Sequence, residues 1–246
     1  MSIPRLGVVI DDDTRLMAHH GLPVAVLALR STWLNPPRAK GASSLANRLD
    51  ERYPSAVRAI YAWHYVTHGP QDRAAAQASR SLGSAVAPQT WGHLQASPVV
   101  EEAWQTTKTC AEQLGASTIV LSTPPSFTPS ALNRARLREF VESQRNRVDA
   151  LVWDVRGLWS AGDAMVTARS LDIGVMLPAS ESREALTGDP DGRLWLRIEH
   201  GRREADQLFE NLASAEATHD ALTVLFTGAR AETDLRQFHA RCEREL

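Results

Sequence analysis

The sequence predicts a single α/β domain over residues 1–246, in which eight parallel strands close into a TIM-barrel-like (β/α)8 barrel enclosed by helices. Two observations lead to this prediction. Eight short β-rich runs recur along the chain with helical segments between them, and 246 residues is close to the ~250 that one such barrel uses. Most of the runs are almost continuously apolar rather than alternating, which is typical of parallel strands buried on both faces.

The predicted strands leave room for a helix after most of them. They span residues 5–11, 23–30, 55–63, 117–123, 149–156, 172–178, 193–199 and 221–227. An open doubly wound sheet is the alternative, but that fold usually has a glycine-rich phosphate turn after its first strand. Here the first strand runs into Asp11, Asp12 and Asp13, so the barrel is favoured.

The segments between the strands predict the helices. Residues 98–114 have apolar side chains at helical spacing, and Gly115 follows as a C-terminal stop. Further helices are predicted at 132–144, 161–171, 203–212 and 231–243, with weaker and shorter signals at 14–20 and 182–186. The segment 69–97 is rich in Ala, Ser and Gln, and we expect a short helix and a mobile stretch there.

Composition excludes several classes of protein. Lys and Arg number 27 against 29 Asp and Glu, so the net charge of −2 provides no general attraction for nucleic acid or anionic membranes. The chain has no apolar run of about 18 residues and no signal-peptide pattern, which predicts a cytoplasmic protein without a membrane partner. In that compartment Cys110 and Cys242 are expected to be reduced.

No cofactor and no metal site are predicted. The sequence lacks a P-loop, a dinucleotide fingerprint and a zinc-protease motif. Ser122 and Ser126 lie in a Ser-Thr-Pro-Pro-Ser stretch that does not match a nucleophile elbow. The run Asp11 to Asp13 could hold a divalent cation, but such a run is more often solvated or caps a helix.

Charged side chains gather where the predicted strands end. An ionised group on the outer, helix-covered face of a strand would be costly, so we expect these groups at the C-terminal mouth, where barrel active sites lie. The interpretation as a ligand site makes them a polar cup for an anion such as a phosphate or carboxylate. The alternative is an ion-pair network that closes the end of the barrel. The groups are Arg30, His64, His68, Asp154, Arg156, Arg197, Glu199, His200 and Arg230.

Roles can be assigned under the interpretation as a ligand site. His68 or His200 would act as acid or base, since a histidine titrates near neutral pH, and Asp154 would assist. Arg156 and Arg197 would hold the anion. The expected ligand-binding residues are Arg30, Trp63, Arg156, Trp159, Arg197 and Glu199, of which the tryptophans would stack a ring.

Several motifs, in order, resemble the YecE-like family (domain of unknown function 72, DUF72). The resemblance covers roughly residues 24–245 and implies a TIM-barrel-like fold, but it implies no established activity. The motifs are STWLNPP at 31–37, AWHYVTH at 62–68, VLSTPPSFTPS at 120–130 followed by the helix pattern at 133–140, VWDVRGLW at 152–159 and LRIEHGRRE at 196–204.

The departures from the family pattern fall on its polar positions. Ala28 stands where the family usually has Glu, Arg30 where it has Asn, Tyr61 where it has Lys, and Asp154 where it has Glu. The Phe-Asn-Asn pattern that ends the eighth strand is Phe-Thr-Gly at 226–228. Removing both members of a buried ion pair can be nearly neutral for folding, so the loss of Glu and Lys together is compatible with a retained fold.

Two functions follow from these observations. The first is a non-catalytic or reassigned barrel that binds a small anionic ligand or a protein partner. The alternative is a hydrolase-type enzyme acting on a phosphorylated or nucleotide-like substrate, with His68 or His200 as acid or base.

Overall fold

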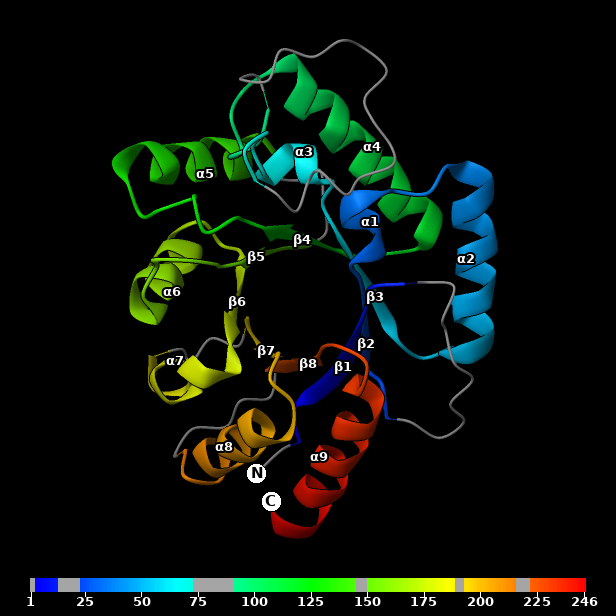
Figure 1. Cartoon of the computed structure of the whole chain (residues 1–246), viewed down its shortest axis with the longest axis vertical. Coiled ribbons are helices and arrows are strands. Elements are labelled where there is room, and N and C mark those ends of the chain that lie inside the picture. Colours follow the sequence, from blue (N-terminus) through cyan, green and yellow to red (C-terminus); the bar gives the residue numbers. More distant parts are fainter. Residues whose placement is uncertain (1–2, 13–22, 73–90, 145–149, 189–192, 216–221) are drawn as a thin grey trace.

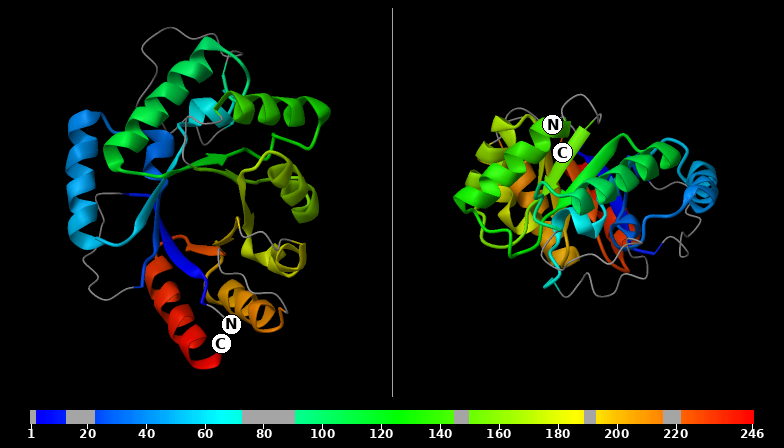
Figure 2. Two further views of the ribbon diagram at one scale, coloured as in Figure 1. Left: turned by 180° about the vertical axis from the view of Figure 1, so that it is seen from behind. Right: turned by 90° about the horizontal axis from the view of Figure 1, so that it is seen from above.

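The structure is a computed structural model that describes residues 3–12, 23–72, 91–144, 150–188, 193–215 and 222–246. Its strands close into a parallel barrel in the order β1 to β8, so the predicted (β/α)8 barrel is confirmed. Figure 1 shows the helices arranged around the outside of this ring, and the view from behind shows the same arrangement (Figure 2). The strands are β1 (Arg5–Ile10), β2 (Val26–Leu29), β3 (Val57–Tyr61), β4 (Thr118–Ser122), β5 (Ala150–Asp154), β6 (Gly174–Pro178), β7 (Leu194–Ile198) and β8 (Thr223–Phe226).

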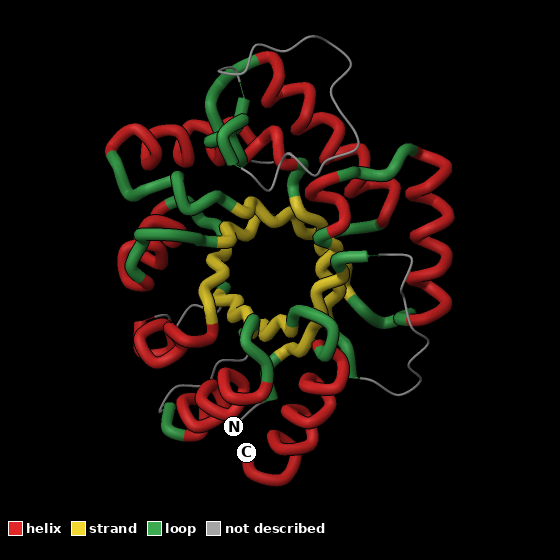
Figure 3. Tube along the Cα trace, viewed as in Figure 1, coloured by secondary structure: helices red, strands yellow, loops and turns green. Residues whose placement is uncertain are grey.

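Each strand pairs with the next along the chain, and β8 pairs with β1 through registers such as Leu6 with Val224. Figure 3 shows the resulting closed ring. All eight predicted runs contain a strand. The helices are α1 (Ser31–Leu34), α2 (Ala39–Arg52), α3 (His64–Thr67), α4 (Pro98–Leu114), α5 (Ala131–Gln144), α6 (Ala161–Ser170), α7 (Ser182–Gly188), α8 (Arg202–Ala213) and α9 (Ala231–Glu245), with a 3₁₀ turn at Ala179–Glu181.

Helix α4 has the predicted bounds because both of its ends are encoded locally. The Ser97 hydroxyl accepts a hydrogen bond from the backbone N–H of Val100, and Pro98 occupies the first helical position. Gly115 then adopts a left-handed conformation with φ of 61°, which ends the helix at little steric cost.

Helix α2 was not among the predicted helices. Its buried residues are only Ala42, Leu45 and Leu49, a narrow stripe on an otherwise polar segment. These residues recur at intervals of three and four, which is helical spacing, so the signal for α2 was present in the sequence. The predicted helix at 14–20 and most of the segment 69–97 lie outside the described residues.

Alternate side chains of the strands belong to two separate apolar clusters. One cluster includes helix residues such as Leu45 and Trp104 and fills the layer between strands and helices. The other consists of strand residues, with Ala25 and Trp33 beside it, and fills the barrel interior. The interior residues are Val9, Val26, Ala28, Ala59, Tyr61, Val120, Val152, Met176, Trp195 and Leu225.

Strand alternation places a polar layer above this interior cluster. Arg30, Ser122, Asp154 and Arg197 each lie two residues beyond an interior residue of their own strand, and so they share its inward face. Tyr61 closes β3 on the same face. The expectation that charged groups gather at the C-terminal mouth therefore matches the fold.

Candidate functional site

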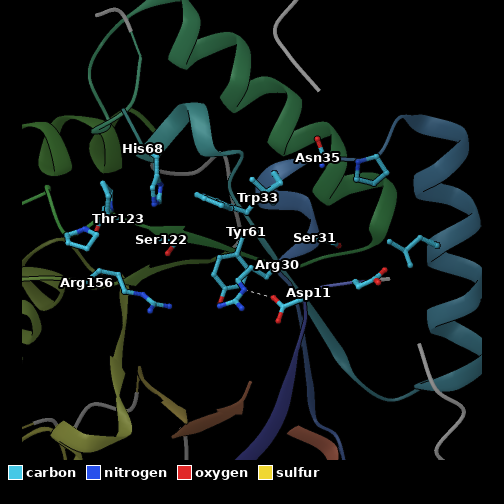
Figure 4. Close-up of a pocket in the computed structure, with 16 residues that line it drawn as sticks. Asp11, Arg30, Ser31, Trp33, Asn35, Tyr61, His68, Ser122, Thr123 and Arg156 are labelled. Carbon is cyan, nitrogen blue, oxygen red and sulfur yellow. Dashed lines mark hydrogen bonds and ion pairs between the residues drawn. The ribbon is translucent and has the colours of Figure 1, made fainter. Parts of the chain in front are cut away.

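A cavity of about 620 Å³ opens at the C-terminal mouth of the barrel. Its walls come from the ends of β1 to β5 and the segments that follow them, and Figure 4 shows their side chains around the opening. The site therefore covers one side of the mouth. The lining residues are Asp11, Asp12, Arg30, Ser31, Trp33, Leu34, Asn35, Pro37, Leu45, Tyr61, His68, Ser122, Thr123, Pro124, Pro125 and Arg156.

Asp154 is the centre of an ion-pair network beside this cavity. It is fully buried, and one of its carboxylate oxygens pairs with the Nη1 of the buried Arg197. Its other oxygen accepts a hydrogen bond from Ser122 Oγ at 2.8 Å and lies 3.4 Å from Arg156 Nη2. Asp154 is therefore held by three donors from three different strand ends.

Glu199 completes the network from the end of β7. Its Oε1 accepts a hydrogen bond from Arg156 Nη1 at 2.8 Å. Arg197 Nε lies 3.0 Å from the same oxygen, but its N–H is not directed at that atom as a hydrogen bond requires. Two arginines thus face two carboxylates, which is the ion-pair arrangement that the sequence left open as the alternative to an anion site.

Arg30 and Arg156 are the cavity arginines, and each already has a carboxylate partner. Arg30 Nε lies 2.5 Å from Asp11 Oδ1, the pair marked by a dashed line in Figure 4. Burial acts to lower the pKa of Arg30, but Asp11 raises it by more. Burial likewise acts to lower the pKa of Arg156, and Asp154 and Glu199 raise it overall. Both guanidinium groups are therefore charged and paired.

Tyr61 lies at the floor of the cavity and is 1% exposed. Within the described part of the chain, no group forms a hydrogen bond with its hydroxyl. Burial and the charge of Asp154 raise the pKa of Tyr61, so the hydroxyl stays protonated and can donate. A buried polar group without a partner costs about 1–3 kcal/mol of stability. The departure from the family pattern at position 61 was the one sign of this role in the sequence.

Two buried histidines lie beside Trp33. His68 lines the cavity, its Nδ1 is 2.9 Å from Thr67 Oγ1, and its ring meets Trp33 edge-on at 4.6 Å between centroids. His64 Nδ1 lies 3.2 Å from the Trp33 carbonyl oxygen. Burial lowers the pKa of both histidines to about 4, so both imidazoles are neutral at pH 7.

The other predicted site residues lie elsewhere. Trp63 and Trp159 are buried in the layer between strands and helices, where their indole N–H groups donate to the carbonyls of Leu34 and Phe127. They do not line the cavity; Trp33 is the tryptophan that does. His200 is exposed and lies outside the cavity.

Glu204, which was not predicted from the sequence, is a buried carboxylate that shapes the mouth. Glu204 Oε2 accepts hydrogen bonds from the backbone N–H groups of Glu199 at 2.7 Å and His200 at 2.9 Å. Its Oε1 accepts from the backbone N–H of Ser180 at 3.1 Å. The signal was present, since a Glu three residues after Gly201 at a helix start resembles a capping box.

Replacing Glu204 with glutamine is expected to lower the free energy of unfolding by about 1–3 kcal/mol. The amide group would turn an N–H₂ toward at least one of the backbone donors that the carboxylate now satisfies. Urea denaturation measures the difference. An unchanged unfolding midpoint would contradict a supporting role for Glu204.

The acidic run after β1, the cysteines and the helices have the following properties. Among the residues that the structure describes, no group of three or more potential ligands gathers around a point that could hold a metal ion. Asp13 lies outside those residues, and Asp11 pairs with Arg30. Cys110 and Cys242 are both buried, and no disulfide joins them. No helix in the described ranges is long and apolar enough to cross a membrane.

The fold and the cavity together define an α/β barrel with a polar pocket at its C-terminal mouth, and solved structures share this fold. A DUF72 family protein from Enterococcus faecalis aligns with a TM-score of 0.62 at 7% identity, covering 99% of this chain and 95% of its own. A DUF72 family protein from Thermotoga maritima aligns with a TM-score of 0.56 at 13% identity, over 98% of this chain and 100% of its own. A D-tagatose 3-epimerase-like protein aligns with a TM-score of 0.58 at 11% identity, over 98% and 97%.

These structural similarities show the barrel fold. Some of the similar structures are DUF72 family proteins, in agreement with the resemblance in the sequence. No protein-family model and no curated protein matches the sequence.

Proposed function

We propose that this chain is a divergent relative of the DUF72 family that acts as a non-catalytic binding barrel, with the mouth cavity as its ligand site. The observation that carries the proposal is the cavity itself. Its volume of about 620 Å³ falls in the range of small-molecule sites, and it lies where barrels place their sites. Five strand ends contribute polar side chains to it, against apolar walls from Trp33, Pro124 and Pro125.

The position, burial and pKa of the acid and base candidates support binding over hydrolysis. Asp154 is buried, engaged by three donors and not among the residues that line the cavity, which favours a role as a counter-charge over one in proton transfer. His200 is outside the cavity, and His68 is a weak base because burial lowers its pKa to about 4. A hydrolase-type enzyme, the alternative, would need an acid and a base in the cavity, and these candidates do not provide them as well as the cavity provides a binding site.

A thermal-shift screen tests the proposal. The purified protein would be melted with neutral sugars and polyols, carboxylates, sugar phosphates and nucleotides. A true ligand at 100 times its Kd stabilises the folded state by about 2.7 kcal/mol, or a rise in Tm of about 5–10 °C for a chain of this size. We expect at least one compound to do so, and to be recovered unchanged after incubation with the protein.

Two arginine variants localise the response. Arg30→Met removes a guanidinium that lines the cavity, and we expect it to weaken the shift. Arg193→Met is the matched control, since Arg193 also pairs with one aspartate, Asp172, but lies outside the cavity. If no compound raises Tm, or if both variants respond alike, the cavity is not the ligand site, and a search for a protein partner takes its place.

A further inference from the structure

The chemistry of the cavity floor restricts what can bind there. Tyr61 is almost fully buried, its hydroxyl has no partner among the described residues, and Figure 4 shows its side chain beside Arg30 with Arg156 facing both. A hydroxyl can donate one hydrogen bond and accept others. The floor of the cavity therefore offers a donor and an acceptor that the protein itself leaves unused.

The charges around this hydroxyl are already balanced. Arg30 is paired with Asp11 and Arg156 with Glu199, at 2.5 Å and 2.8 Å. Arg197 is paired with Asp154 beneath them. A phosphate or sulfate would have to compete with these carboxylates for the arginines, and it would lie close to the buried charge of Asp154. The anion that the sequence predicted thus meets no free counter-charge here.

A neutral polyhydroxylated molecule meets neither obstacle. Its hydroxyls can pair with Tyr61 and accept from the terminal N–H groups of Arg30, because among the described residues that guanidinium contacts Asp11 through Nε. The Trp33 ring and the prolines at 124 and 125 offer apolar walls of the kind that pack against the C–H faces of a sugar ring.

The arginines of the mouth are paired with carboxylates, and the Tyr61 hydroxyl has no partner among the described residues. We infer that the ligand of the mouth cavity is a neutral sugar or polyol held by Tyr61. The inference rests on the proposed binding function and adds the chemical class of the ligand. It replaces the small anionic ligand that the sequence predicted.

Isothermal titration calorimetry with matched pairs of probes tests the class. D-Glucose, D-ribose and myo-inositol would be titrated alongside glucose 6-phosphate, ribose 5-phosphate and myo-inositol 1-phosphate. We expect at least one neutral probe to bind, with a Kd at least tenfold below that of its phosphorylated partner. Tighter binding of the phosphorylated probes would overturn this inference and leave the proposed function standing. Binding of none of the probes would overturn the inference, while a hit elsewhere in the thermal-shift screen would still support the function.

A pair of hydroxyl deletions tests the role of Tyr61. Tyr61→Phe removes the one hydroxyl in question, and we expect at least tenfold weaker binding of the neutral probe with a Tm that is unchanged or raised. Thr223→Val is the matched control, since Thr223 is also buried, its hydroxyl has no hydrogen-bond partner among the described residues, and it does not line the cavity. We expect it to leave the Kd unchanged. Equal Kd values for Tyr61→Phe and the parent protein would overturn the inference.

Discussion

Replacing Arg197 with methionine is expected to lower the free energy of unfolding by about 3–5 kcal/mol. Asp154 has no exposed surface, and Arg197, itself only 2% exposed, is its main counter-charge. Losing the cation leaves a buried carboxylate that the more distant Nη2 of Arg156, 3.4 Å away, neutralises only in part. Urea denaturation at pH 7 measures the loss.

Two further variants separate this cause from a loss of packing. In Asp154→Asn/Arg197→Met the uncompensated charge is gone, and the asparagine oxygen can still accept from Ser122, so we expect most of the stability to return. Arg193→Met breaks an exposed pair and should cost no more than about 1 kcal/mol. A double variant as unstable as the single one would show that packing, rather than charge, explains the effect.

The sequence was sufficient to place these charges but not to pair them. Runs of apolar residues identified the strands, and the cost of burying an ion placed Asp154 and Arg197 at the mouth. Their pairing depends on how the closed barrel brings the ends of β5 and β7 together on either side of β6, which no local pattern encodes. Because such pairing cannot be read from the sequence, Arg156 and Arg197 resembled an anion site, although Glu199 and Asp154 neutralise them.

Strand ends are the second place where sequence reasoning reached its limit. Counting two residues on from Tyr61 puts Trp63 on the same inward face, but β3 ends at Tyr61 and the alternation stops there. Trp63 turns into the layer under the helices, and its N–H donates to Leu34. Trp33, on the short helix α1 after β2, reaches the cavity in its place.

Acidification from pH 7 to pH 5 is expected to destabilise the protein through His64 and His68. Burial lowers both pKa values to about 4, against about 6.5 in an unfolded chain. Between these values the unfolded state binds more protons than the folded state, so stability falls as the pH falls and the loss levels off near pH 4. At about 1.4 kcal/mol per pKa unit, each histidine contributes about 2 kcal/mol of loss by pH 5.

Substitution of His68 tests how much of this loss of stability comes from its imidazole. His68→Phe keeps an aromatic ring against Trp33 and removes one titrating group, so the difference in unfolding free energy between pH 7 and pH 5 should shrink by about 2 kcal/mol. The same substitution at exposed His200 is the control and should retain the full difference. A pH dependence equal in parent and His68→Phe would mean that His68 binds its proton at the same pH in the folded and the unfolded protein, so that burial does not lower its pKa. It would then be a stronger base than a buried imidazole, and the case for catalysis at the mouth would reopen.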